Sequence, residues 1–237
     1  CHQAGIHVAA LRGETEFLRN VRATAEHAIG LTLALIRRIP AAHASVLAGR
    51  WERDAFRGRE LHGQVAGIIG MGRLGSIVAG YFRALGMSVI GYDPRHDFPH
   101  ELARRCATLE ELVSAADVIS VHVAYQPSTR HLLGAQEFAH VKPGAVVVNT
   151  SRGGIIDQAA LLTALQEGRL SGAALDVIDG EPNVGADHPL VAYARHHDSL
   201  LITPHLGGNT IDSLAKAEAF IAAKARRIWN EIAATAA

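Results

Sequence analysis

The stretch at residues 65–75 constrains this chain more than any other. It places a short apolar run before three glycines in the spacing Gly70-x-Gly72-x-x-Gly75, and an apolar segment with helical periodicity follows. This order predicts a strand, a tight turn and a helix. The first glycine then permits the turn, the second lets a pyrophosphate approach the backbone, and the third lets the helix pack closely on the strand. The N–H groups of the helix N-terminus would face the phosphates, so the stretch predicts a dinucleotide site rather than an ordinary glycine turn.

A second apolar run, at residues 88–92, ends at Asp93. An acid that binds ribose is expected about 20 residues after such glycines. Its carboxylate accepts hydrogen bonds from the ribose hydroxyls and repels a 2′-phosphate, which favours NAD over NADP. Arg95 lies two residues further on and weakens that preference.

Charge and hydropathy exclude several classes of partner. The 237 residues carry 23 Lys and Arg against 23 Asp and Glu, so no net charge argues for nucleic acid or for an anionic membrane surface. No apolar run reaches the ~20 residues of a membrane-spanning helix. With 49% hydrophobic residues, the chain is long enough to bury a sizeable core.

The ends and the cysteines bear on processing and location. The chain begins with Cys1 rather than Met and shows no signal peptide, which fits a fragment or a processed chain. Cys1 and Cys106 are the only cysteines and make neither a disulfide framework nor a metal cluster. We therefore expect a reducing, cytoplasmic setting.

Short apolar runs alternate with helix-like segments from residue 65 onward. We expect strands over residues 65–69, 88–92, 117–122, 145–149, 173–177 and 200–203. A capping box at Thr108 and an N-cap at Asp157 mark two of the helices between them, and a final helix should occupy most of residues 210–232. Strands rich in Val and Ile, without alternation, indicate a parallel sheet covered on both faces. Right-handed crossovers then give a doubly wound α/β fold.

The first 62 residues are harder to assign. Residues 5–11 are typical of a short strand, and a helix should run over residues 21–38, where Pro40 stops it. The apolar stripe of that helix is broad enough to suggest burial on more than one side. Residues 41–62 lack clear periodicity, so we interpret them as a connector or arm that contacts another subunit.

Reactive side chains follow four of the expected strands. They are Asp93, Arg152, Asp176 with Glu181 close behind it, and His205. In a parallel sheet these positions share one edge, where ligands bind. An arginine, a carboxylate and a histidine are therefore expected beside the cofactor.

Each of these residues also has a simpler interpretation. An arginine before Gly-Gly can anchor a loop, a glutamate before proline is usually a solvated turn residue, and most of the 14 histidines are expected at the surface. His96, His100, His196 and His197 invite a metal site, but no Cys or carboxylate set completes one, so we expect no metal.

Taken together, the motifs resemble the D-isomer-specific 2-hydroxyacid dehydrogenase family, which includes D-3-phosphoglycerate dehydrogenase and glyoxylate/hydroxypyruvate reductases. The resemblance runs from about Ala23 to Leu214. The markers are Gly70-Met71-Gly72-Arg73-Leu74-Gly75, Val121-His122-Val123 with Pro127 and Thr129, Asn149-Thr150-Ser151-Arg152-Gly153-Gly154, Ala174-Leu175-Asp176-Val177, Glu181-Pro182 and Thr203-Pro204-His205.

The resemblance implies a role for each marker. Arg152 matches the arginine that holds the substrate carboxylate and the reacting oxygen, His205 the acid/base, and Glu181 the carboxylate that pairs with it, favours imidazolium and fixes the ring tautomer. Asp176 matches the residue that orients the nicotinamide carboxamide. The cofactor contacts implied for NAD are Gly70, Gly72, Arg73, Leu74, Gly75, Asp93, Val123, Thr150, Ser151, Arg152, Asp176, His205, Gly207 and Gly208.

The implied reaction is hydride transfer between NAD(H) and a small D-2-hydroxy acid or 2-keto acid, of the phosphoglycerate, glyoxylate or hydroxypyruvate type, in a homodimer. The resemblance also implies domains: residues 1–20 as a remnant of a flavodoxin-like substrate domain, 21–208 as the NAD-binding Rossmann domain, and 209–237 as a helix that packs on the substrate domain. Because most of that substrate domain has no counterpart here, a non-catalytic NAD(H)-binding or dimerisation module remains the alternative.

Overall fold

The computed structural model describes residues 6–236 of the chain. It divides into two compact units. One comprises residues 24–207. The other combines the described residues up to Ala23 with those from Gly208 onward. Every predicted site residue except Gly208 falls in the first unit.

The larger unit is built on a parallel sheet. Its strands are β1 (Val65–Ile69), β2 (Ser88–Tyr92), β3 (Arg104–Arg105), β4 (Val118–Val121), β5 (Ala145–Asn149), β6 (Leu170–Leu175) and β7 (Leu200–Ile202). They lie in the order β3-β2-β1-β4-β5-β6-β7, and all pairs are parallel. The order reverses direction beside β1, which confirms the doubly wound α/β fold. The two-residue strand β3 was not predicted, because it is too short to show a pattern.

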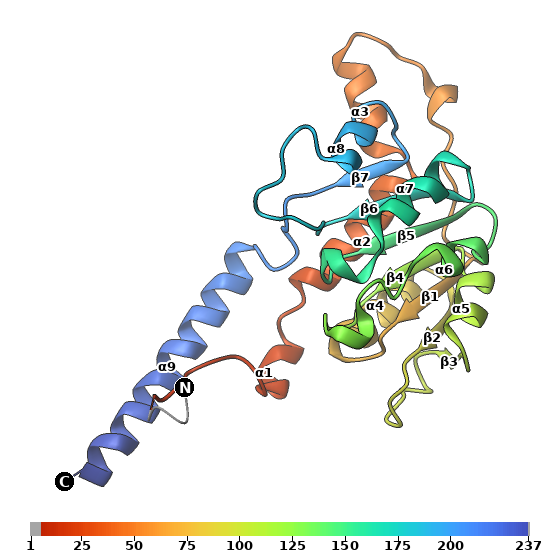
Figure 1. Cartoon of the computed structure of the whole chain (residues 1–237). Helices are drawn as coiled ribbons and strands as arrows, with labels where there is room; N and C mark the ends of the chain where they lie inside the picture. The colour runs from red at the N-terminus through yellow and green to blue at the C-terminus, as the bar shows by residue number, and fades with distance from the viewer. Residues whose placement is uncertain (1–5, 237) are drawn as a thin grey trace. The chain divides into compact units, whose positions relative to one another are not determined.

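Helices cover both faces of this sheet (Figure 1). Side chains of α2 (Ala23–Ile36) and α4 (Arg73–Ala84) form the core on one face. The other face is covered by α5 (Leu109–Ala115), α6 (Ala135–Ala139), α7 (Gln158–Gln166) and α8 (Pro189–Ala194). The interior strand β5 is buried along its whole length, which explains its run of valines.

The predicted caps are confirmed. The side chain of Thr108 accepts a hydrogen bond from Glu111 N at the start of α5. Asp157 accepts from Ala159 N and Ala160 N at the start of α7. Both helices therefore begin with a side chain on their free N–H groups.

The prediction for residues 21–62 is partly wrong. The helix ends at Ile36, because Arg38 takes a left-handed conformation, with φ 53°. Pro40 does not only end a helix: it lies in the first turn of a new one, α3 (Ile39–Leu47), where its fixed φ and missing N–H cost nothing. The expected connector thus contains α3 and a short 3₁₀ helix, η2 (Arg53–Phe56).

The predicted strand at residues 5–11 is also wrong over its described part, since residues 6–11 form no strand. Within this smaller unit they lie against α9 (Ile211–Ala236), the final helix, which extends beyond its predicted end. Lys224 Nζ donates to Ala10 O at 2.9 Å and to Glu14 Oε1 at 2.6 Å, and the rings of Phe17 and Phe220 stack 4.1 Å apart. Side chains of a helix therefore hold this segment, and no strand of the described chain pairs with it.

Even α9, with 26 residues, fails as a membrane span, and no other helix within residues 6–236 is long and apolar enough for one.

Candidate functional site

The glycine turn follows β1 at the point where the strand order reverses. Gly70 has a φ of 91°, which suits glycine, and its N–H donates to Tyr92 O. A Cβ on Gly75 would collide with Gly70 O, so α4 packs on the turn at a distance only glycine permits. The structure thus assigns to both glycines the backbone duties of a dinucleotide turn.

The N-cap of α4 is Gly72, which has no side chain to cap the helix, whereas the N-cap side chains of α5 and α7 each accept a backbone hydrogen bond. Arg73 and Leu74 occupy the first turn; Leu74 packs on the core, and burial lowers the pKa of the Arg73 guanidinium. A helix N-terminus beside a glycine turn offers N–H donors and a positive dipole end to a pyrophosphate.

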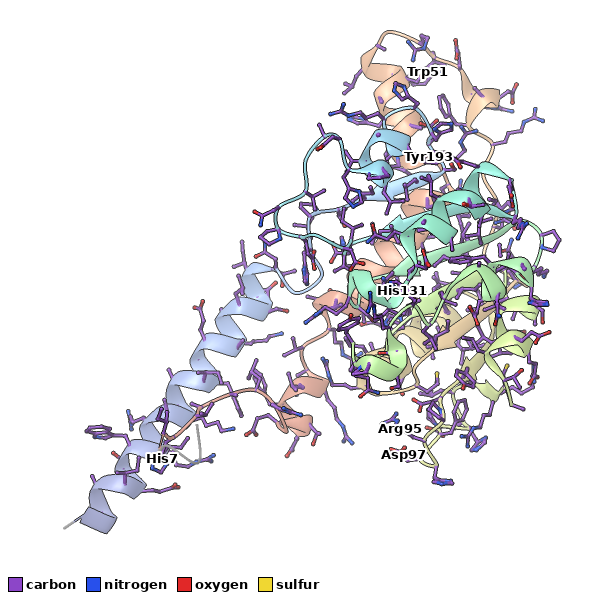
Figure 2. The ribbon with its side chains drawn as sticks, in the orientation of Figure 1. His7, Trp51, Arg95, Asp97, His131 and Tyr193 are labelled. Atoms are coloured by element: carbon purple, nitrogen blue, oxygen red, sulfur yellow. The ribbon has the colours of Figure 1, made fainter. Side chains whose placement is uncertain are left out.

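Asp93 lies at the carboxyl end of β2 and is 6% exposed. Its Oδ2 accepts from Met71 N at 2.9 Å, which ties the acid to the glycine turn. Arg95 donates its backbone N–H to Oδ1, and its guanidinium contacts both carboxylate oxygens at 3.0–3.2 Å. Burial alone would raise the pKa of Asp93, but these hydrogen bonds lower it below the ordinary value. Figure 2 shows Arg95 with Asp97 at the loop after β2.

A cavity of ≈ 440 Å³ opens between these elements. Its lining includes Gly70, Gly72, Asp93, Arg95, His122 and Val123. Ser120 Oγ lies 2.8 Å from His122 Nε2, whereas Nδ1 of that ring is buried and finds no hydrogen-bond partner among the described residues. Burial lowers the pKa of His122 to about 4, so the ring is neutral near pH 7.

The loop after β5 carries Thr150, Ser151 and Arg152. Asn149 organises it: its Oδ1 accepts from Ser151 N, and its Nδ2 donates to Arg152 O. Thr150 Oγ1 is buried and has no hydrogen-bond partner within residues 6–236. The Arg152 side chain is exposed and donates to Ser151 O, and no contact joins it to Glu181 or His205 within the described chain.

The loop after β7 is wrapped around Asp176, which is 1% exposed at the end of β6. His205 N donates to Asp176 O at 2.8 Å. The carboxylate accepts from Leu206 N at 2.7 Å on Oδ1 and from Gly207 N at 2.8 Å on Oδ2. A Cβ on Gly207 would lie 3.1 Å from Oδ2, so this close approach favours glycine. The loop thereby holds His205 at a φ of 56°, a conformation uncommon for a non-glycine residue.

His205 and Glu181 are brought together. Their Nδ1 and Oε1 atoms lie 3.1 Å apart, and the side chains are 46% and 29% exposed. Because a carboxylate oxygen accepts, Nδ1 carries the proton, and Nε2 is left for a reacting group. The pair borders a cavity of ≈ 820 Å³ whose lining is largely apolar.

The structure therefore joins some of the predicted residues and leaves others apart. Gly70, Gly72, Asp93 and Val123 line one cavity, and Asp176, Glu181 and His205 line another, whereas Gly75, Arg152 and Gly207 line neither. Gly208 begins the smaller unit.

Sequence reasoning missed His27 and Thr203, whose side chains contact the Asp176 carboxylate. The only signal was a histidine within the apolar stripe of α2.

These residues fit a dinucleotide. The glycine N-cap of α4, the glycine turn with its positive φ and the cavity lined by Asp93 are features that suit a dinucleotide. Fold and site together define a Rossmann dinucleotide-binding domain with a histidine–carboxylate pair at the opposite end of the cofactor edge.

Comparisons with known proteins define it further. Residues 29–207 match the family described as D-isomer specific 2-hydroxyacid dehydrogenase, NAD binding domain. The chain belongs to this family, and this part of it is an NAD-binding domain.

Individual relatives agree. D-3-phosphoglycerate dehydrogenase of Methanocaldococcus jannaschii is 40% identical over 209 residues, which cover 86% of this chain and 38% of the relative. The enzyme of that name from Haemophilus influenzae is 37% identical over 90% of this chain and 52% of its own length. The crystal structure of D-lactate dehydrogenase from Aquifex aeolicus, complexed with NAD and lactic acid, superposes with a TM-score of 0.82 at 30% identity. The superposed region covers 98% of this chain and 72% of the lactate dehydrogenase chain. The chain thus spans about 38% to 52% of the length of the two curated relatives.

Proposed function

We propose that this chain supplies the cofactor-binding and acid/base half of an NAD-dependent D-2-hydroxyacid dehydrogenase. The substrate would be a small D-2-hydroxy acid or 2-keto acid of the phosphoglycerate, glyoxylate or hydroxypyruvate type. The nicotinamide, when bound, supplies or accepts the hydride at C2 of that acid. We place the reaction in a reducing cytoplasm, because the buried Cys106 is a free thiol.

The observation that carries the proposal is the His205–Glu181 pair on its rigid loop. Glu181 Oε1 accepts from Nδ1 and orients the ring, so His205 donates a proton from Nε2 to the C2 oxygen during reduction and takes it back during oxidation. Arg152 reorients from Ser151 O to hold the substrate carboxylate through its planar fork. In this scheme Asp93 accepts the adenosine ribose hydroxyls, and the N-terminus of α4 takes the pyrophosphate.

The test is the loss of NADH absorbance at 340 nm with a panel of 2-keto acids, together with His205→Ala. We expect kcat to fall by about 10²–10⁴-fold, the effect of one general acid/base. NADH affinity, measured by calorimetry, should change little. His140→Ala removes an exposed histidine of the α6 C-cap and is the matched control. Unchanged turnover in His205→Ala would refute the assignment.

The second candidate is a module that binds NAD(H) without catalysis. It is favoured by one observation: the Arg152 side chain donates to Ser151 O and makes no contact with Glu181 or His205 among the described residues. Binding of NADH with no oxidation by any 2-keto acid would select this alternative. Absence of both would point to a dimerisation module.

We also propose that the protein is a homodimer. The large side chains Ile39, Val46, Leu47 and Trp51 of α3 and the following segment are 53%, 48%, 75% and 86% exposed. Figure 2 shows Trp51 in that segment, beyond the edge of the sheet. A second copy that covers these side chains would explain their exposure. Analytical ultracentrifugation should give a dimer, and Trp51→Lys should shift it towards monomer; a monomeric wild-type protein would contradict the proposal.

A further inference from the structure

Both oxygens of the Asp176 carboxylate accept hydrogen bonds from groups of the protein itself. Oδ1 accepts from Leu206 N and from Thr203 Oγ1, at 2.7 and 2.6 Å, and Oδ2 accepts from Gly207 N. His27 from α2 completes the shell, with Nε2 3.1 Å from Oδ1. One buried acid therefore holds both sides of His205 through backbone and side-chain donors.

The proton positions in this cluster follow from the chemistry of its members. Thr203 has one hydroxyl proton, and it is given to Asp176 Oδ1. His27 Nε2 lies 3.1 Å from that hydroxyl oxygen and 3.1 Å from the carboxylate, and each of these atoms can only accept from it. Nε2 must therefore carry a proton and donate to both.

The fold fixes His27 at this place. Ala25 and Ala28 are fully buried on the same helix and press its first turns against the sheet. A Cβ on Gly207 would lie 3.1 Å from Thr24 Cγ2, so the helix also approaches the far end of the loop. The imidazole, 22% exposed, then closes the one side of Asp176 Oδ1 that the loop leaves open.

We propose that His27 is a positioning residue for the acid/base His205. It acts through Asp176: by donating to the carboxylate and to Thr203, it keeps the carboxylate aimed at Leu206 N and Gly207 N. Those two bonds hold the loop in the turn that gives His205 its left-handed backbone and places its ring beside Glu181. The proposal rests on the function proposed for His205, but its structural part can be measured without turnover.

The first experiment uses the wild-type protein. Long-range proton–nitrogen NMR on the histidine rings should show His27 protonated on Nε2. The amides of Leu206 and Gly207 should resonate downfield and resist hydrogen exchange, because they donate to a buried carboxylate. A His27 ring that carries its proton on Nδ1 alone would overturn the proposal, since Nε2 would then have nothing to donate.

The second experiment compares His27→Leu with His27→Gln, whose amide N–H₂ reaches about as far as Nε2. In His27→Leu we expect the Leu206 and Gly207 amides to exchange at least about tenfold faster. His27→Gln should restore most of this protection. Thr32→Val is the control, because Thr32 is buried in the same helix and donates only to Ala28 O. Equal protection in wild type and His27→Leu would refute the proposal, as would equal loss in Thr32→Val.

The activity readout separates positioning from general damage. With a 2-keto acid that the wild type reduces, His27→Leu should lower kcat by about 10-fold or more, while KM for the acid and affinity for NADH stay within about twofold. If His27→Leu does not fold, His27→Gln alone must show near-normal kcat and protection, and failure to do so would count against the proposal. If the wild type has no turnover, the function proposed for His205 fails, whereas the NMR results still decide the role of His27.

Discussion

Two aspartates follow two strands of the same sheet and line two different cavities. Asp93 follows β2 and Asp176 follows β6, and both are buried. Each accepts from two backbone N–H groups and faces one basic side chain, Arg95 in the first case and His27 in the second.

The two aspartates differ in how easily the basic side chain can move away from the carboxylate. The Arg95 side chain is 51% exposed, so it can leave the Asp93 carboxylate for solvent. His27 is 22% exposed and belongs to a packed helix, and the other donors to Asp176 belong to the His205 loop. Asp93 can therefore exchange a partner for a ligand more readily than Asp176, whose expected contact with the nicotinamide carboxamide stays a prediction. The same residue type after a parallel strand is thus poised for binding in one place and for support in the other.

The largest effect that tests this contrast is on stability. Asp176→Ala would leave two backbone N–H groups and one hydroxyl without an acceptor, and each buried orphan costs about 1–3 kcal/mol. We expect a loss of about 4 kcal/mol in the free energy of unfolding by urea. Asp93→Ala should cost only about 1–2 kcal/mol, because Met71 N alone is left buried without an acceptor, whereas the exposed Arg95 can turn to solvent. Equal losses would break the comparison, and Asp157→Ala, a lost helix cap, provides a scale of about 1 kcal/mol.

The next effect concerns acid, and it distinguishes Asp93 from its neighbour in the cavity, His122. The lowered pKa of His122, about 4, favours the neutral ring in the folded state. The contribution of this neutral ring to the free energy of unfolding is fully present above the unfolded pKa near 6.5. It is lost as the pH falls to 4, by up to about 3 kcal/mol. The pKa of Asp93 is lowered as well, so its contribution fades only at lower pH. The free energy of unfolding by urea should therefore change less between pH 7 and pH 4 in His122→Gln than in the wild type. A pH dependence equal to that of the wild type would contradict this.

A smaller effect should appear in cofactor affinity. If Asp93 accepts the ribose hydroxyls, Asp93→Ala raises the Kd for NADH by about 10- to 30-fold, the value of one charged hydrogen-bond set. Calorimetry measures it directly. Asp97→Ala is the matched control, since Asp97 lies in the same loop and approaches Arg95 only through Oδ2, 3.7 Å from Nη1. A Kd within twofold of wild type would show that Asp93, like Asp176, serves the protein alone.

Sequence patterns predicted the parts of this site that depend on neighbouring residues. The glycine spacing, the apolar strands and the caps at Thr108 and Asp157 are local, so the chain shows them directly. The strand-end rule also brought Asp176, Glu181 and His205 to one edge, because the carboxyl ends of parallel strands coincide.

What the patterns missed depends on distant contacts or on very short elements. His27 and Asp176 are 149 residues apart, and nothing in either segment encodes their pairing. The helix after Pro40 was missed because a proline ends one helix and begins another with the same fixed φ. Residues 6–11, the described part of the expected strand, are apolar but have no strand to pair with in the described chain. They contact α9 instead.

The smallest effect concerns Arg95 itself. In the proposed function its guanidinium competes with the ribose for the Asp93 carboxylate, and such a half-exposed pair is worth up to about 1 kcal/mol. Arg95→Ala should therefore tighten NADH binding, by at most about threefold in Kd. The same change should weaken NADPH binding, because it removes the cation that a 2′-phosphate would meet beside Asp93.

NADH and NADPH affinities are expected to change in opposite directions in Arg95→Ala. If the change only loosened the loop, both cofactors would bind more weakly. If it only frees the Asp93 carboxylate, NADH binds more tightly, and NADPH binds more weakly because that carboxylate then repels its 2′-phosphate. Titration of both cofactors by calorimetry, with Asp97→Ala alongside, separates these outcomes. Weaker binding of NADH in Arg95→Ala would mean that the pair is fixed in the bound state, and Asp93 would then resemble Asp176 rather than contrast with it.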